Sequence, residues 1–369
     1  MTTTLTVNAR ELTTELTWIA KASGKAPSTP AVAAVHLSAG AGLLRLRRTN
    51  YDQFAETSIG ADTTGEGAIL IDRAKLIPVL KGQRGPATLT FTAEELTIST
   101  GGTTVTLRAA AALDDYPTWP EFADGASTAL LTADELARAV TSCGDDPTLP
   151  MLTGVRFDEG YVMASTDRFR LTTISYAGCG KPLVALVPAT VLHPFTRSDE
   201  LVTVEDGVLS RTGDGVKVSA GRRSVIARTL DAEFPKFKQL IPSEDAATVR
   251  VVIKRDDLLK AVGPDDNYIT LTLTADGTLT AVDSDPRGEM SVTQQMPVVK
   301  VLRGDGLPFT VRMQAKNLRG ALKGIASGVL HFDALTPVKP VVLRGLSGDE
   351  LHMIMPVRMP APAAADTAA

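Results

Sequence analysis

The sequence predicts an α+β fold made of three tandem copies of one module, each with two helices packed on antiparallel sheet. An amphipathic segment around Leu12 returns around Leu136 and again around Leu258, at steps of 124 and 122 residues. Solenoid repeats have periods of roughly 20–50 residues, so a period of about 120 residues corresponds to a whole small domain. We therefore expect three similar domains rather than a stack of short units.

A second amphipathic segment follows the first in each copy. These segments lie around Leu76, Leu192 and Leu318. Two of them contain a proline, Pro78 and Pro194, which removes a backbone donor and clashes with the preceding helical turn. We expect these two helices to be short, kinked or late to begin.

Runs of alternating apolar and polar residues lie between the helical segments and predict strands, about eight in each module. Three runs, residues 87–100, 200–212 and 341–354, contain polar or glycine residues near the middle and predict hairpins. The domain boundaries that follow are 1–122, 123–245 and 246–360. Residues 361–369 are rich in alanine and predict a disordered tail.

Composition bounds the class of protein. The chain has 369 residues, of which 44% are hydrophobic, enough for two or three ordinary cores. It has two cysteines, Cys143 and Cys179, and its start does not resemble a secretion signal, so we expect a reducing cytoplasm. No apolar run approaches the roughly 20 residues of a membrane span, so we expect no membrane contact.

The placement of charge is more informative than the net charge of −4. The six helical windows, residues 9–25, 71–85, 132–143, 188–198, 253–260 and 314–324, hold fifteen Lys or Arg and seven acids, a balance of +8. The rest of the chain then carries −12. Basic helices beside acidic strands and loops favour one surface for a polyanion. The alternative is that Lys and Arg simply occupy solvated helix faces.

The sequence has no arrangement typical of a catalytic or metal site. The histidines His36, His193, His331 and His352 are not at metal-ligand spacing, and neither a phosphate-binding loop, a GxSxG elbow nor a dinucleotide fingerprint is present. We therefore expect a non-catalytic scaffold without metal or cofactor.

Four stretches carry a resemblance to a known family. They are ASTDRFRL at 164–171, MIMPVRM at 353–359, RTLDAEFPKFKQLIP at 228–242 and LDDYPTWP at 113–120. Together, in this order and spacing, they resemble the bacterial DNA polymerase III β subunit, the replicative sliding clamp, in its actinobacterial type. The resemblance covers nearly the whole chain.

The resemblance implies a head-to-tail homodimer, a ring of six modules that encircles duplex DNA without sequence preference. In this family, short linear peptides of the polymerase α subunit, the clamp loader and repair polymerases bind between the second and third domains. The ring thereby tethers these replication and repair proteins to DNA and gives processivity.

The positions that match the family's peptide pocket come from the middle copy, the junction after it and the end of the chain. They are Leu152, Thr166, Arg168, Phe169, Arg170, Leu171, Pro242, Val338, Pro340, Met355, Pro356, Val357, Arg358 and Met359. We expect Phe169, Leu171 and Met359 to present apolar surface, with Arg170 and Arg358 beside them. Two methionines suit recognition of several ligands.

The basic helices, together with the resemblance, predict residues that contact DNA phosphates. They are Lys25, Arg73, Lys81, Arg84, Arg197, Lys254, Arg319 and Lys323.

The chain also departs from the family's pattern. Gly263-Pro264 should end the first helix of the third copy early, which would open or rebuild one wall of the peptide pocket. Gln314 and Asn317 stand where the family commonly has Asn and an aromatic residue. The alternative to a working clamp is a diverged second copy that keeps the ring and serves as an interaction or decoy scaffold with altered partners.

Overall fold

The computed structural model describes residues 2–178, 180–209 and 213–359. Over this part of the chain one order of elements occurs three times: strand, helix, three strands, strand, helix, three strands. The repeat predicted from sequence is therefore present in the secondary structure. The predicted tail and Cys179 lie outside the described residues.

The first repeat has two long segments of helix and two short additions, α2 and β5. Its elements are β1 (Thr3–Asn8), α1 (Ala9–Ala22), α2 (Pro30–Ala33), β2 (Val35–Gly40), β3 (Leu43–Thr49), β4 (Gln53–Gly60), β5 (Asp62–Thr64), β6 (Gly67–Ile71), α3 (Arg73–Leu80), β7 (Pro86–Phe91), β8 (Glu95–Thr100) and β9 (Thr103–Arg108).

The second repeat has short helices followed by 3₁₀ turns. Its elements are β10 (Phe122–Leu131), α4 (Ala133–Ala139), η2 (Val140–Ser142), η3 (Pro150–Leu152), β11 (Gly154–Asp158), β12 (Val162–Thr166), β13 (Arg170–Ser175), β14 (Ala185–Pro188), α5 (Ala189–Leu192), η4 (His193–Phe195), β15 (Val202–Leu209), β16 (Gly213–Ala220) and β17 (Arg223–Arg228).

The third repeat adds one strand, β22. Its elements are β18 (Val249–Lys254), α6 (Arg255–Ala261), β19 (Tyr268–Leu273), β20 (Thr278–Ser284), β21 (Ser291–Pro297), β22 (Lys300–Gly304), β23 (Phe309–Gln314), α7 (Ala315–Gly324), β24 (Val329–Ala334), β25 (Val341–Gly345) and β26 (Glu350–Ile354).

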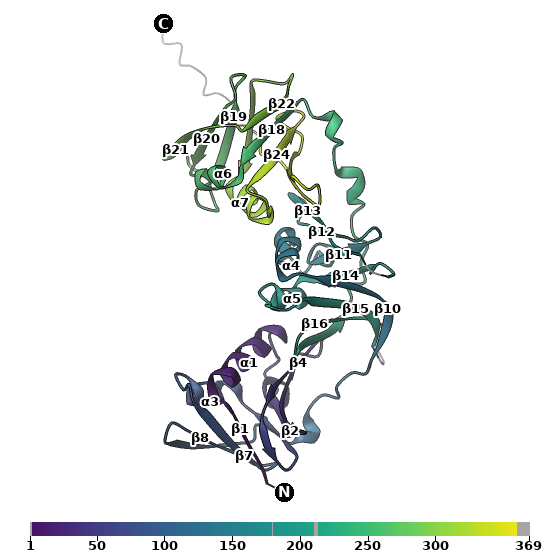
Figure 1. The fold of residues 1–369 in the computed structure, drawn as a ribbon, viewed down its shortest axis with the longest axis vertical. Coiled ribbons are helices and arrows are strands. Elements are labelled where there is room, and N and C mark those ends of the chain that lie inside the picture. The colour runs from purple at the N-terminus through teal and green to yellow at the C-terminus, as the bar shows by residue number, and fades with distance from the viewer. Residues whose placement is uncertain (1, 179, 210–212, 360–369) are drawn as a thin grey trace. The chain divides into compact units, whose positions relative to one another are not determined.

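The chain divides into two compact units. Their helices and strands are labelled in Figure 1. Unit 1 comprises the chain up to Leu136 with Ala177–Asp231, and unit 2 comprises Ala137–Tyr176 with the chain from Ala232 onward. Elements of the second repeat belong to both units. The units therefore do not follow the predicted boundaries at 122 and 245, which stay a prediction.

Each unit contains a sheet that joins two repeats. In unit 1 the strand order β10-β15-β16-β17-β4-β3-β2-β6 joins the second repeat to the first through the antiparallel pair β4–β17, and a second sheet has the order β5-β1-β7-β8-β9. In unit 2 the order β11-β12-β13-β26-β25-β24-β18-β22 joins the second repeat to the third through β13–β26, beside the sheet β21-β20-β19-β23.

The helices end where the sequence places proline and glycine. Pro78 lies inside α3, which has eight residues, and α5 has four residues before a 3₁₀ turn that contains Pro194. The early end of α6 at Ala261 is confirmed. The Gly263 N–H donates to Asp283 Oδ1 at 3.0 Å, and a Cβ on Gly263 would lie 1.9 Å from Asp283 Oδ2. Glycine is therefore required at this helix end.

The hairpins at 87–100 and 341–354 are confirmed as β7–β8 and β25–β26. The hairpin predicted within 200–212 is wrong, because Val202–Leu209 forms one strand, β15. Gly207 in this strand allows close packing and does not form a turn. A Cβ on Gly207 would lie 2.4 Å from the Phe122 ring and 2.5 Å from the Ala123 carbonyl.

Candidate functional site

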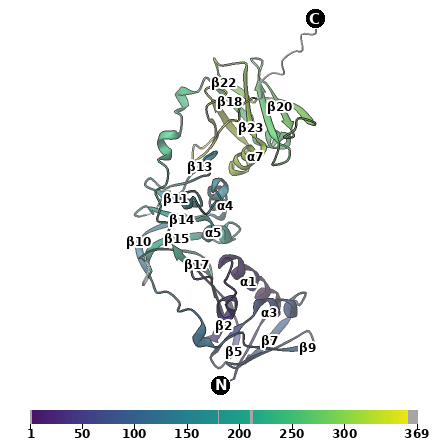
Figure 2. The same ribbon diagram turned by 180° about the vertical axis from the view of Figure 1, so that it is seen from behind.

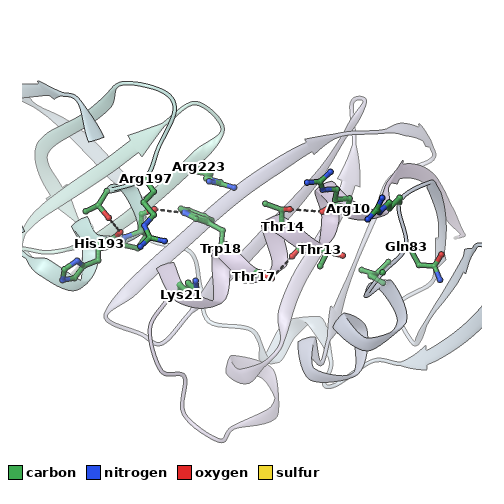
Figure 3. A pocket seen from close by; sticks show the side chains of 15 residues that line it. Arg10, Thr13, Thr14, Thr17, Trp18, Lys21, Gln83, His193, Arg197 and Arg223 are labelled. Atoms are coloured by element: carbon green, nitrogen blue, oxygen red, sulfur yellow. Dashed lines mark hydrogen bonds between the residues drawn. The ribbon is translucent and has the colours of Figure 1, made fainter. Parts of the chain in front are cut away.

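A groove of about 920 Å³ runs along α1 in unit 1. Arg10 and Lys21 of α1 line it together with Arg84, which follows α3, and Arg197, which follows η4. Helices α1 and α3 lie side by side in both ribbon views (Figures 1 and 2). We call this cavity the α1 groove. Figure 3 shows its side chains.

The α1 groove is strongly cationic. Its lining holds five Lys or Arg and no Asp or Glu. One of the five, Arg223, is neutralised, because its guanidinium pairs with buried Glu15 at 2.6 Å and lies 5.1 Å from the centre of the Trp18 ring. The other four are exposed and make no ion pair within the described residues. Net positive charge with little competing acid is what attracts a polyanion.

The floor of the groove is polar but uncharged. The hydroxyls of Thr13, Thr14 and Thr17 donate to carbonyls one turn back along α1, at 2.8–3.0 Å. The Trp18 ring N–H donates to the Pro194 carbonyl at 3.3 Å, which fixes α1 against η4. With their hydrogens used inside the helix, the threonines offer only acceptor oxygens to the groove. Anion binding must then come from the cations at its ends.

Three of the predicted DNA contacts in unit 1 line this groove or the cavity beside it. Arg84 and Arg197 line it, and Lys25 lines an adjoining cavity of about 420 Å³ that also includes Lys21. Arg73 begins α3, and Lys81 follows its last residue. The predicted set omitted Arg10 and Lys21. Their spacing of eleven residues, three helical turns with threonines between, would have placed them on one face of α1.

The helices of unit 2 hold their cations differently. Arg319 forms an ion pair with Asp265 and donates to the Val262 carbonyl at 3.2 Å. Arg255 pairs with Asp256 at 2.9 Å and Lys260 with Asp257 at 3.7 Å. The predicted contacts Lys254 and Lys323 are exposed and make no ion pair in the part of the chain that the structure describes. The same is true of Lys316.

The residues predicted for a peptide pocket all lie in unit 2, where a tight hairpin presents several of them. Asp167 Oδ1 accepts the N–H groups of Phe169 and Arg170 at 2.9 and 2.8 Å, and Thr166 Oγ1 accepts from the Arg168 N–H at 3.2 Å. Arg168 has a φ of 77°, in the left-handed region. These bonds hold Phe169 in solvent, where it is 61% exposed.

The pair β13–β26 brings this hairpin to the end of the chain. Leu171 lies opposite Met353, and the Met355 N–H donates to the Phe169 carbonyl at 2.8 Å. Beyond it, the Val357 N–H donates to the Arg312 carbonyl at 2.7 Å. Segments about 180 residues apart in sequence therefore form one surface.

Other predicted pocket residues border this surface. Pro242 and Pro340 line one small cavity of about 10 Å³, and the Pro242 carbonyl accepts from Arg344 at 3.0 Å. The Gly144 N–H donates to the Leu152 carbonyl at 2.8 Å, and a Cβ on Gly144 would lie 3.8 Å from Asp167 Cβ, which places Leu152 near the hairpin. Pro356 and Val357 are half-buried, whereas Val338, Arg358 and Met359 are exposed.

One expectation about this surface is wrong. Leu171 is 2% exposed, so it supports the sheet and presents no apolar surface. Arg170 pairs with Asp167 at 2.9 Å and packs on Gly320 of α7, where a Cβ would lie 2.7 Å from its Nη1. The cations left at the rim are Arg168 and Arg358, both exposed.

Titration of two groups near this surface is governed by burial. It raises the pKa of the Cys143 thiol to about 12, which keeps it protonated at neutral pH. It lowers the pKa of His352 to about 4. His352 Nδ1 lies 2.9 Å from Thr172 Oγ1 across the strand pair.

Within the described residues, no three His, Cys, Asp or Glu side chains are grouped as a metal site requires. In the same part of the chain, no helix is both long enough and apolar enough to cross a membrane.

Comparison with known proteins gives one consistent set of relatives. No family model matches the chain. The beta sliding clamp of Streptomyces coelicolor is 26% identical over 374 residues, which cover 93% of this chain and 96% of that protein. The beta sliding clamp homolog GriR of Streptomyces muensis is 28% identical over 256 residues, which cover 64% of this chain and 66% of that protein.

Solved structures agree with these sequences. The DNA polymerase sliding clamp of Bacillus subtilis matches with a TM-score of 0.83 at 16% identity, over 98% of this chain and 100% of that one. The β subunit of the DNA polymerase of Streptococcus pyogenes matches with a TM-score of 0.81 at 18% identity, over 96% and 100%. At these identities the structures establish the fold, and the predicted α+β clamp architecture is confirmed.

Proposed function

We propose that the chain, which is similar to bacterial beta sliding clamps over nearly its whole length, encircles duplex DNA and tethers polymerase and other replication and repair proteins to it. The supporting observation is the way in which each repeat pairs with the next. We propose that it does so as a non-catalytic ring of two chains, with three domains per chain bounded at residues 122 and 245.

Equivalent strands join the repeats. In the first, second and third repeats, the third strand after the first helix is β4, β13 and β21, respectively. The last strand of the repeat is β9, β17 and β26, respectively. Two of the three possible partnerships are made within the chain, β4–β17 and β13–β26. The strands left over are β21 and β9, each at the edge of its sheet in the described residues. Pairing β21 of one chain with β9 of a second repeats the same joint.

The two free edges carry apolar side chains on their core-facing sides. In β9, Val105 and Leu107 lie opposite buried Ile98 and Leu96. In β21, Val292 lies opposite buried Asp283 but is itself 47% exposed. An exposed apolar strand edge is a site for pairing with another chain. Because the same contact forms twice in a head-to-tail dimer, the ring closes and leaves neither edge free.

In this proposal DNA occupies the hole and meets the basic helices. Phosphates supply sequence-independent attraction that weakens as salt is added. Topological linkage supplies the long residence that such contacts do not. Partner proteins bind through short peptides at the surface formed by Phe169, Val338, Met355 and Met359, between the exposed cations Arg168 and Arg358. An apolar surface with a cationic rim suits a peptide with apolar and acidic side chains.

A diverged clamp with altered partners is the second candidate, and a specific observation favours it. Helix α6, which in the family contributes to the pocket wall, ends at Ala261. Ring formation is common to both candidates, so binding of partner peptides distinguishes them.

The mass of the assembly tests the ring directly. One chain has a mass of 38.9 kDa, so native mass spectrometry at micromolar concentration should give about 78 kDa, twice that value. Leu107→Lys, which places a charge on the core-facing side of β9, should give monomers. Thr106→Lys on the opposite side of the same strand should leave the dimer intact. A wild-type protein that is monomeric at this concentration would remove the proposal.

A further inference from the structure

We propose that the α1 groove of unit 1 is the chain's main contact with the DNA backbone and that the α6–α7 face of unit 2 is a minor one. The inference rests on the proposed function, in which both surfaces meet DNA. It adds that unit 1 makes more of the contacts with DNA than unit 2 does, whereas the proposed function alone would allow equal contributions from every repeat.

The cations of the groove lie at both of its ends. Figure 3 shows Arg10 and Gln83 toward one end of α1 and Lys21, His193 and Arg197 toward the other. Arg84 directly follows Gln83. Eleven residues separate Arg10 from Lys21, which at 1.5 Å per residue is about 16 Å. One strand of B-DNA carries a phosphate about every 3.4 Å of axis, so the two ends can contact different phosphates of one backbone.

The polar groups between and beneath these cations are occupied by bonds within unit 1. The threonine hydroxyls of the floor donate within α1, and Glu15 of the same helix is occupied by Arg223 and accepts from the Thr57 hydroxyl at 2.8 Å. Arg10, Lys21, Arg84 and Arg197 keep their full charge for a ligand. Arginine binds phosphate with two parallel hydrogen bonds, which gives hold on the backbone without reading bases.

Unit 2, in contrast, holds several of its helix cations in ion pairs. Arg255, Lys260 and Arg319 each have an acidic partner on or beside α6. A phosphate that approached them would have to displace a carboxylate, and the pair as a whole carries no net charge to attract it. Lys254, Lys316 and Lys323 remain, as single exposed amines that make no ion pair within the described residues. Lysine contacts phosphate as a point charge.

The test compares two double variants that each remove two positive charges. The groove variant is Arg10→Ala with Arg197→Ala, and the helix-face variant is Lys254→Ala with Lys323→Ala. All four side chains are exposed or at the surface, so native mass and circular dichroism should match the wild type. Lys181→Ala, an exposed residue of unit 1 outside the groove, controls for the loss of one charge.

The measurement is the dissociation constant of the full-length protein for a short linear duplex of about 20 base pairs at several salt concentrations. Each lost phosphate contact lowers the slope of log K against log salt by about 0.9, so the groove variant should lose about 1.8. The helix-face variant should lose less than half as much, and Lys181→Ala should match the wild type. Equal losses in the two double variants, or a larger loss from the helix face, would overturn the inference.

Retention of the wild type on circular DNA separates this inference from the proposed function. If the wild type stays on circles and the two variants lose equal slope, the clamp function stands and the uneven distribution fails. If the wild type leaves circles as fast as linear DNA while the groove variant still loses more slope, the groove binds DNA and the clamp function fails.

Discussion

The two units build the same joint with opposite charges. In unit 1 a helix acid, Glu15 of α1, pairs with Arg223, the first residue of β17. In unit 2 a helix base, Arg138 of α4, pairs with Glu350, the first residue of β26. The strands paired at the joints are equivalent in the repeat. This backbone arrangement therefore accepts an ion pair of either polarity, and the repeats differ in where they place charge.

The opposite polarity of the two ion pairs affects which strands can pair and how much free charge each unit has at its surface. If β17 were to pair where β26 belongs, Arg223 would meet Arg138, and like charges in a partly buried site repel. The pair in unit 1 is also the reason that the α1 groove has no free acid. Unit 2 instead uses most of its helix cations in internal pairs. One unit therefore keeps its positive charge for a ligand, and the other uses much of it to hold its own structure.

The largest effect should come from breaking the deeper joint. The side chains of Arg138 and Glu350 are 15% and 4% exposed, so Arg138→Ala would leave a buried carboxylate without its partner. Loss of one member of a buried pair lowers the free energy of unfolding by about 3–5 kcal/mol. Urea denaturation measures it.

Two comparisons sharpen that prediction. Arg223→Ala should cost less, because the side chain of Arg223 is 31% exposed and water can reach Glu15 when it is removed. Arg156→Ala, whose pair with Asp158 is longer and more exposed, should cost less than about 1 kcal/mol. Equal losses at Arg138 and Arg156 would show that the joint in unit 2 contributes no more than a surface pair.

The next effect concerns acid. His352 lies in the joint of unit 2, and its folded-state pKa of about 4 is below its ordinary value of 6.5 because burial disfavours the charged ring. The unfolded chain binds this proton first, so stability is complete above pH 6.5 and is lost as pH falls toward 4. At about 1.4 kcal/mol per unit, the loss is on the order of 3 kcal/mol.

His352→Gln should remove this part of the pH dependence, whatever it does to stability at neutral pH. The measurement is the free energy of unfolding from pH 7 to pH 4 for the two proteins. His193→Gln at the rim of the α1 groove is the comparison: burial also lowers the pKa of His193, but less than that of His352, so this variant should lose a smaller part of the slope. An unchanged slope in His352→Gln would place the acid sensitivity elsewhere.

A smaller effect is expected at the peptide surface of unit 2. A peptide of the Gln-x-x-Leu-Phe type should bind with a dissociation constant in the micromolar range, about −8 kcal/mol. Phe169→Ala and Met359→Ala should each weaken it by about 1–2 kcal/mol, because each removes exposed apolar contact area. Calorimetry measures this, with Leu201→Ala, an exposed residue of unit 1, as the control. Undiminished binding in both variants would favour a diverged clamp with its partner site elsewhere.

The sequence predicted what depends on local residues and on repetition. The three-fold order of elements, the proline-limited helices α3 and α5 and the end of α6 before Gly263-Pro264 follow from residue types and spacing. Gly207 misled the prediction because a glycine permits both a turn and a close approach, and only the Phe122 ring decides between them.

The ion pairs could not be predicted from the local sequence. Arg319 and Asp265 are 54 residues apart, and Arg223 and Glu15 are 208 apart, so the sequence could not show which cations are neutralised. The peptide surface was located through family motifs rather than through physics. Its strand pairing buries Leu171 and exposes Phe169, an alternation that the motif alone did not assign correctly.

Retention on closed circular duplex tests the central claim most directly. The chain is diluted until its dimers dissociate, reconcentrated with circular DNA, and passed over a sizing column at a salt concentration that abolishes phosphate contacts. A ring around DNA remains on the circles and is released when one restriction cut linearises them. Release from intact circles at the same rate as from linear DNA would contradict the account.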